Sequence, residues 1–158
     1  MVIFVTCSDP KFIIYLGKDK YENEDLIKYG LPTDVWFHVD KFSSAHVYLR
    51  LPQDVTIDTI PKQVMSECLQ LVRDGSKDGR KQEKVSVVYT PWANLRKTQA
   101  MEIGEVGFKN EKEVHHVQNV TKDKDLLKKL MRIWVEKEID FVAEKKAYDL
   151  EKKINKLN

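Results

Sequence analysis

The chain has 158 residues, of which 42% are hydrophobic and 33% are charged, and its formal net charge is +2. This length suffices for one domain with a buried core. No apolar run approaches the roughly 18 residues of a membrane span, and the short apolar N-terminus lacks the pattern of a signal peptide. We therefore expect a cytoplasmic protein, and the alternative is a protein that is also found in the nucleus.

Two short runs of β-branched and aromatic residues begin the chain, at residues 2–6 and 12–16. The Ser-Asp-Pro sequence between them predicts that they form a hairpin. Residues 22–29 then carry two apolar side chains among charged ones, and Gly30 follows directly. This pattern predicts a short helix.

Residues 34–40 and 45–51 each alternate in hydrophobicity, which predicts two antiparallel strands of a hairpin. Successive side chains of a strand point to opposite faces, so like faces meet only if the loop has an odd number of residues. A loop over residues 41–45 satisfies this condition and predicts one polar, aromatic face with an apolar face behind it. The pairs that it predicts are Asp40 with His46, His38 with Tyr48, and Trp36 with Arg50.

The second half of the chain predicts a helix, short strands and a helical end. The predicted elements are a helix at 59–74, a basic loop without core residues at 74–84, strands at 85–89, 105–108 and 114–120, and a connector at 91–98. From residue 123 to 158, apolar residues at helical spacing predict one long helix with a coiled-coil-like repeat. The expected fold is α+β, a mainly antiparallel sheet with two packing helices, as a domain at 1–120 followed by a helical region at 121–158.

The polar face of the central hairpin is suited to nucleic acid. Trp36 and Tyr48 can stack on bases, and Arg50 can pair with a phosphate or stack on a ring. His38 and His46 can donate hydrogen bonds to a phosphate or a 2′-hydroxyl. The alternative is a hydrogen-bonded sheet face that the C-terminal helix half buries.

Long cationic side chains on exposed backbone supply phosphate contacts, which confer affinity rather than sequence preference. The candidates are Lys18 and Lys20 before the first helix, Lys77, Arg80 and Lys81 in the basic loop, and Arg96 and Lys97 on the connector. The alternative for the basic loop is a merely solvated surface, because acidic residues dilute its charge.

Catalysis is the other chemistry that the histidines suggest. His38, Asp40 and His46 are a candidate acid–base cluster, and adding a histidine at 115 or 116 suggests a metal site. However, the chain has no nucleophile elbow, no HExxH and no CxxC motif. We therefore expect a protein that is not an enzyme and that holds no metal or cofactor.

The two cysteines, Cys7 and Cys68, each lie in a mostly apolar segment. Two isolated cysteines provide neither a disulfide framework nor the spacing of a metal site. We expect both to be reduced thiols in the core.

Five motifs occur in the order found in the NFACT-R domain family, which the chain resembles over nearly all of residues 1–120. They are GKDKYENE (17–24), DVWFHVD (34–40), SSAHVYLR (43–50), VVYTPWANLRKT (87–98) and GEVGF (104–108). Several motifs in one order are far more specific than any of them alone.

The resemblance implies an RNA-binding domain with an α+β fold. Relatives carry this domain in larger proteins of ribosome-associated quality control that recognise tRNA and the large ribosomal subunit. The family's core motif residues would be Gly17, Glu22, Asn23, Asp34, Trp36, His38, Ser44, His46 and Arg50, with Asn94 and Lys97 in a second basic motif.

These observations predict a non-enzymatic protein that binds tRNA or rRNA on the ribosome. DNA binding is an alternative, because binding dominated by phosphate contacts discriminates poorly. A second class is an interaction adaptor, in which residues 123–158 pair with a partner helix or with a second copy. A third is a hydrolase that uses the histidine cluster.

Overall fold

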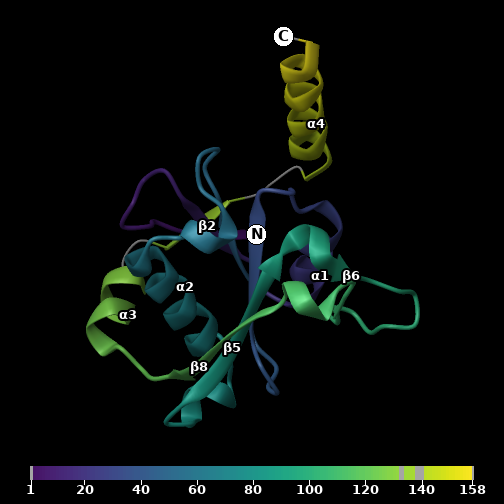
Figure 1. Cartoon of the computed structure of the whole chain (residues 1–158). Coiled ribbons are helices and arrows are strands. Elements are labelled where there is room, and N and C mark those ends of the chain that lie inside the picture. Colours follow the sequence, from purple (N-terminus) through teal and green to yellow (C-terminus); the bar gives the residue numbers. More distant parts are fainter. Residues whose placement is uncertain (1, 132–133, 138–140, 158) are drawn as a thin grey trace.

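The structure is a computed structural model that describes residues 2–131, 134–137 and 141–157. Its centre is a seven-stranded sheet in which every pair of neighbours is antiparallel, in the order β8-β5-β3-β4-β2-β1-β9 (Figure 1). The strands are β1 (Val2–Val5), β2 (Ile13–Leu16), β3 (Asp34–Val39), β4 (Val47–Arg50), β5 (Val85–Pro91), β8 (His115–Val120) and β9 (Trp134–Lys137). Two further strands, β6 (Leu95–Arg96) and β7 (Gly107–Phe108), pair separately.

Four α-helices accompany the sheet within the described ranges: α1 (Lys20–Tyr29), α2 (Lys62–Asp74), α3 (Lys124–Met131) and α4 (Phe141–Leu157). The side chain of Asp19 caps α1 by accepting hydrogen bonds from the backbone N–H groups of Tyr21 and Glu22. None of the helices in these ranges has the length and apolar character needed to cross a bilayer. The predicted α+β class, with a mainly antiparallel sheet and a C-terminal helix, is confirmed.

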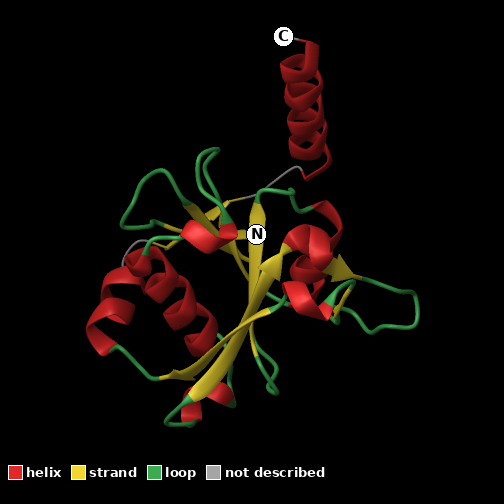
Figure 2. Cartoon of the chain, viewed as in Figure 1, coloured by secondary structure: helices red, strands yellow, loops and turns green. Residues whose placement is uncertain are grey.

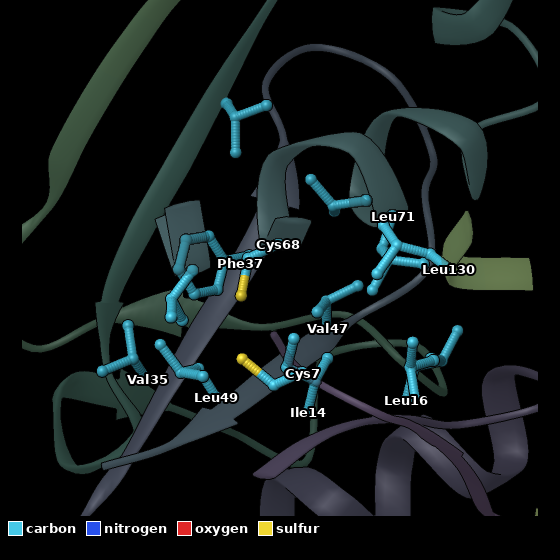
Figure 3. Packing of buried hydrophobic residues seen from close by; sticks show 14 of the residues in the cluster. Cys7, Ile14, Leu16, Val35, Phe37, Val47, Leu49, Cys68, Leu71 and Leu130 are labelled. Carbon is cyan, nitrogen blue, oxygen red and sulfur yellow. The ribbon is translucent and has the colours of Figure 1, made fainter. Parts of the chain in front are cut away.

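One face of the sheet packs against α2, with α3 beside it. Val64, Cys68 and Leu71 recur at helical spacing along α2, so one apolar stripe faces the sheet. Figure 3 shows the sulfur atoms of Cys7 and Cys68 among the buried apolar side chains of this cluster. Both cysteines are free and buried, which confirms the prediction of reduced core thiols.

The other face of the sheet carries a second core, built from its aromatic side chains. Trp36 and Tyr48 are 2% and 0% exposed, because Leu26 of α1 and apolar side chains of the segment at 92–114, such as Leu95, pack on them. Figure 2 shows helices on both sides of the strands. The predicted polar, aromatic face is therefore on the expected side of the sheet but is largely covered. Trp36 and Tyr48 are covered by these two segments. The C-terminal helix, which the alternative interpretation placed over this face, contacts α1 and brings Glu144 within 3.8 Å of Arg50 at the end of the face.

The central hairpin forms with the predicted parity but in a different register. Trp36 pairs with Tyr48, and not with Arg50, whose partner is Asp34. The register is thus shifted by two residues, and the connection covers residues 40–46 instead of 41–45. A shift of two leaves each side chain on its face, so hydrophobic alternation cannot detect it.

The single helix predicted for residues 123–158 is wrong, because β9 interrupts it. The backbone of β9 pairs antiparallel with β1, Val2 with Lys137 and Val5 with Trp134. Helical spacing of apolar residues between α3 and α4 hid this strand, whose formation depends on the open edge of β1. Figure 1 shows α4 extending away from the sheet as a separate helix.

Candidate nucleic-acid interface

A groove of about 860 Å³ opens where three segments meet at the end of β3. The segments are the β3–β4 connection, the first turns of α1, and the stretch at 102–108. The lining residues are Lys20, Asn23, Trp36, His38, Val39, Asp40, Lys41, Phe42, Ser43, Ser44, His46, Val88, Glu102, Ile103, Gly104, Glu105, Val106 and Phe108. The groove thus brings together Lys20, Asn23, Trp36, His38 and His46 from the predicted site.

The aromatic side chains of the groove hold one another in place. The ring of His38 stacks on Trp36 with centroids 5.3 Å apart, and His46 lies edge-on to Trp36 at 5.5 Å. Phe108 meets Trp36 edge-on at 5.6 Å from the opposite wall. Trp36 is therefore enclosed by neighbouring rings, and His38 keeps partial exposure beside it.

Both groove histidines are held in the neutral form. Burial lowers the pKa of His38, although the Val39 carbonyl and Asp40 oppose this effect. Burial, with smaller effects of His38 and Lys97, lowers the pKa of His46 to about 3. Near neutral pH the two rings therefore offer hydrogen bonds without positive charge.

The first turns of α1 provide a cationic and a polar group at the rim. Lys18 and Lys20 are exposed, and Lys20 reaches the groove. Asn23 is buried, and its Oδ1 has no hydrogen-bond partner among the described residues. A Cβ on Gly17 would lie 2.4 Å from this oxygen, so the glycine of the first motif gives Asn23 its space.

Lys97 holds the stretch at 102–108, which forms one wall of the groove. Its Nζ donates to the backbone carbonyl of Glu105 at 2.8 Å and forms an ion pair with Glu24 at 2.9 Å. The same Glu24 carboxylate accepts from the N–H of Gly104, a residue with φ of +84°. The phosphate contact predicted for Lys97 stays a prediction, but its ammonium group is already engaged within the fold.

Tyr48 and Arg50 lie outside the groove, toward the other end of β4. The Nε of Arg50 forms an ion pair with Asp34 at 2.8 Å, and its guanidinium lies over Tyr15 at 5.2 Å. Tyr48 stacks on Tyr15 with centroids 5.1 Å apart. Burial of Tyr48 and the internal pairing of Arg50 leave both out of the contacts that we propose below.

The basic loop lies next to the groove wall. Lys77, Arg80 and Lys81 are exposed. The loop is tied to the β3–β4 connection, because the Ser76 hydroxyl donates to the Ser43 carbonyl at 2.7 Å. Ser76 and Gly79 are buried, which corrects the prediction that this loop holds no core residues.

The remaining two predicted contacts behave differently from each other. Asn94 is buried and its Nδ2 donates to Thr90 Oγ1 at 2.9 Å and to the Asn110 carbonyl at 3.0 Å, so it fixes the start of the 94–110 segment. Arg96 is exposed on β6.

Sequence reasoning missed the far wall of the groove and its loop residues. These are Lys41 in the connection, and Glu102, Val106 and Phe108 opposite. The signal was present in the GEVGF motif at 104–108, which contributed to the resemblance but was interpreted as a strand only. Among the residues that the structure describes, no three His, Cys, Asp or Glu side chains are grouped to hold a metal ion.

Comparisons with known proteins agree with this architecture. The family described as NFACT protein RNA binding domain matches residues 1–110. Coiled-coil domain-containing protein 25 of Danio rerio is 50% identical over 97% of this chain and 75% of its own length, and that of Mus musculus is 49% identical over 99% and 76%. Protein JLP2 of Saccharomyces cerevisiae is 44% identical over 78% and 61%.

A solved structure shows the same fold at lower sequence identity. The C-terminal part of the fibronectin/fibrinogen-binding protein from Streptococcus suis superposes with a TM-score of 0.65 at 23% identity, over 80% of this chain and 47% of that one. The family matches more than two thirds of the chain, and the relatives in animals are about 50% identical to it. The chain belongs to the family of NFACT protein RNA-binding domains.

Proposed function

We propose that this chain is a non-enzymatic protein that binds structured RNA in the groove between α1, the β3–β4 connection and residues 102–108. Membership in the family supports a nucleic-acid-binding role. The observation that carries the proposal is the groove itself, whose lining includes two neutral histidines and the exposed cations Lys20 and Lys41. Backbone phosphates would meet the cations at the rim, and a sugar or base would reach the rings.

The basic loop extends this surface, because it adjoins the β3–β4 connection. Lys77, Arg80 and Lys81 would contact phosphates farther along the same RNA strand. Such contacts give affinity without reading sequence, and each phosphate contact makes binding more sensitive to salt. We therefore propose that the loop supplies affinity and that the groove supplies selectivity.

The test is the binding of the full chain to tRNA, rRNA fragments and duplex DNA by fluorescence anisotropy at several salt concentrations. We expect Lys20→Met and Lys41→Met each to weaken RNA binding and to reduce the salt slope by about one phosphate contact. Lys62→Met, an exposed lysine on α2 at the opposite face, is the matched control and should change neither. Absent or salt-independent binding to all three nucleic acids would refute the proposal.

Within the class of RNA, we propose tRNA or rRNA on the ribosome as the ligand and a link to ribosome-associated quality control. The family resemblance motivates this choice, together with the cytoplasm, and secondarily the nucleus, as the compartment. Crosslinking of the tagged full chain in cells, followed by sequencing of the bound RNA and DNA, tests it. Recovery of tRNA or rRNA supports the choice, whereas enrichment of DNA would favour the alternative of a DNA-binding protein.

We propose self-association through α4 as a second function. Leu150 and Ile154 are 59% and 49% exposed on α4. With Ala147 they form a stripe at spacings of three and four, which glutamates flank at 144 and 151 and lysines at 146 and 153. In a parallel pair of helices, Lys146 of one copy would face Glu151 of the other, whereas an antiparallel pair would bring like charges together.

Sedimentation of the full chain over a range of concentrations tests the second function. We expect a weak, concentration-dependent dimer, because α4 has only 17 residues. The charge reversal Glu151→Lys should weaken the dimer, and the added substitution Lys146→Glu should restore it. A chain that stays monomeric at every concentration would exclude this function without affecting RNA binding.

A further inference from the structure

His38 and His46 lie edge-on to each other in the lining of the groove. Their ring centroids lie 5.1 Å apart and the ring planes are nearly perpendicular, at 82°. Both rings line the groove. Each ring nevertheless uses one of its two nitrogen atoms inside the fold, which determines what the other nitrogen can do.

The protonation state of His46 follows from its partner Trp36. The indole Nε1–H can only donate a hydrogen bond, and it donates to Nδ1 of His46 at 3.1 Å. Nδ1 of His46 must therefore carry a lone pair, so the ring proton sits on Nε2. His46 offers a hydrogen-bond donor to the groove.

His38 has the opposite tautomer. Its Nδ1 lies 2.6 Å from the backbone carbonyl of Val39, which can only accept, so this nitrogen carries the proton. In the neutral ring, Nε2 then bears a lone pair and is an acceptor. Neither Nε2 atom has a hydrogen-bond partner in the part of the chain that the structure describes.

The groove therefore presents one fixed donor beside one fixed acceptor, and few chemical groups match both. A phosphate without a proton offers only acceptors, so it cannot donate a hydrogen bond to Nε2 of His38. An ammonium group offers only donors. A hydroxyl group both donates and accepts at a single oxygen atom, so it can satisfy the two histidines together.

We propose that His38 and His46 bind a ribose 2′-hydroxyl and so make the groove selective for RNA over DNA. The hydroxyl oxygen accepts from Nε2–H of His46, and the hydroxyl proton is donated to Nε2 of His38. This inference rests on the proposed RNA binding and adds the group that is recognised. Deoxyribose would leave both imidazole nitrogens without a partner, and the loss of two hydrogen bonds corresponds to roughly 10- to 100-fold weaker binding.

The experiment compares one stem-loop oligonucleotide made as RNA, as DNA and as 2′-fluoro RNA, bound to the full chain at fixed salt. Fluorine accepts weakly and cannot donate, so 2′-fluoro RNA should bind more weakly than RNA. Equal affinities for RNA and DNA of one sequence would overturn the inference, because a pair that reads base edges would not detect the sugar. That result would leave the proposed RNA binding intact, whereas failure of both to bind would refute the proposed function and this inference together.

Asparagine variants test the two histidines without removing their internal bonds. In His46→Asn the side-chain oxygen replaces Nδ1 as acceptor for Trp36, and in His38→Asn the amide N–H replaces Nδ1–H as donor to Val39. Both variants lack a group at the Nε2 position. We expect each to lower the RNA-to-DNA affinity ratio toward one mainly by weakening RNA binding, with melting curves verifying the fold, whereas the exposed His116→Asn should keep the wild-type ratio. A wild-type ratio in both groove variants would also overturn the inference.

Discussion

Tyr15 and Tyr48 are stacked ring on ring, but their hydroxyl groups have opposite surroundings. The hydroxyl of Tyr15 donates to Asp34, which also pairs with Arg50. The hydroxyl of Tyr48 is buried and has no hydrogen-bond partner among the described residues. A buried polar group that has no hydrogen-bond partner costs free energy. The hydroxyl group of Tyr15 therefore stabilises the fold, whereas that of Tyr48 destabilises it.

We therefore predict that Tyr48→Phe raises the free energy of unfolding by about 1 kcal/mol, because it removes an unpaired hydroxyl group. Tyr15→Phe should lower it by about 1 to 2 kcal/mol, because Asp34 loses a donor. Urea unfolding of the two variants measures both changes, and each is the control for the other. Destabilisation of similar size in both would mean that Tyr48 has a partner in solution.

His46 makes the stability of the fold depend on pH. Its pKa is about 3 when folded and near its ordinary value of 6.5 when unfolded, so the unfolded chain binds the proton more readily. The stabilisation is fully present above about pH 6.5 and is lost as the pH falls toward 3. The lowered pKa of His38 acts in the same direction.

We predict that the unfolding free energy of the wild type falls more steeply between pH 6.5 and 4 than that of His46→Asn. Carboxylate titration is common to both proteins and cancels in the difference. The exposed His116→Asn should follow the wild-type curve. Parallel curves for the wild type and His46→Asn would show that His46 is not held neutral by burial.

At the scale of elements, the stretch at 97–108 shows how one lysine positions a wall of the groove. Lys97 binds the carbonyl of Glu105 and the carboxylate of Glu24, which in turn holds Gly104. A residue that affects RNA binding only because it holds a loop in place should alter the affinity for RNA without altering the number of phosphates that the protein contacts.

We predict that Lys97→Met weakens RNA binding while the dependence of log Kd on log salt keeps its wild-type slope. Arg96→Met, at the exposed neighbouring position, is the matched control, and any loss of affinity there should come with a shallower slope. A shallower slope for Lys97→Met would identify Lys97 as a direct phosphate contact, as its sequence motif alone suggests.

The central hairpin illustrates how far sequence reasoning reaches. Alternation at 34–51 correctly assigned the faces of Trp36, His38 and His46, because parity follows from side-chain direction alone. The register was missed by two residues, since the hydrogen bond from the Val39 N–H to Ser44 Oγ and the bond from Ser76 to Ser43 set the length of the connection. The second of these bonds joins residues that lie 33 positions apart, and no local pattern reports it.

The groove was half predictable for the same reason. Its histidines and Trp36 share one face of the sheet, which alternation identifies. The covering of Tyr48 and the far wall around Phe108 depend on where the segment at 92–114 crosses the sheet, and that path is a property of the whole fold.

At the scale of the whole molecule, the sheet joins the first and the last of the described strands. β1 lies between β2 and β9, so its outer edge is paired only by residues 134–137. The boundary at residue 120 stays a prediction, but β9 and the buried α3 residues Leu127 and Leu130 contribute to the structure beyond it.

We predict that a chain ending at residue 140 keeps nearly the full melting temperature, because it retains α3 and β9. A chain ending at residue 131 should melt at lower temperature and aggregate, because it exposes the apolar β1 as an open sheet edge. Thermal melting with light scattering measures both. Equal melting temperatures for the two chains would show that β9 adds no stability.

The position of β1 between β2 and β9 also imposes an order on folding during synthesis. β1 leaves the ribosome well before β9, the last described strand, so one edge of β1 stays unpaired until β9 is made, and a contact of such sequence separation forms slowly. During that interval the nascent chain carries an apolar strand that β2 pairs on one edge and that is open on the other. The newly made protein should therefore depend on chaperones more than its size suggests, and a pause in translation before residue 134 should lengthen that dependence.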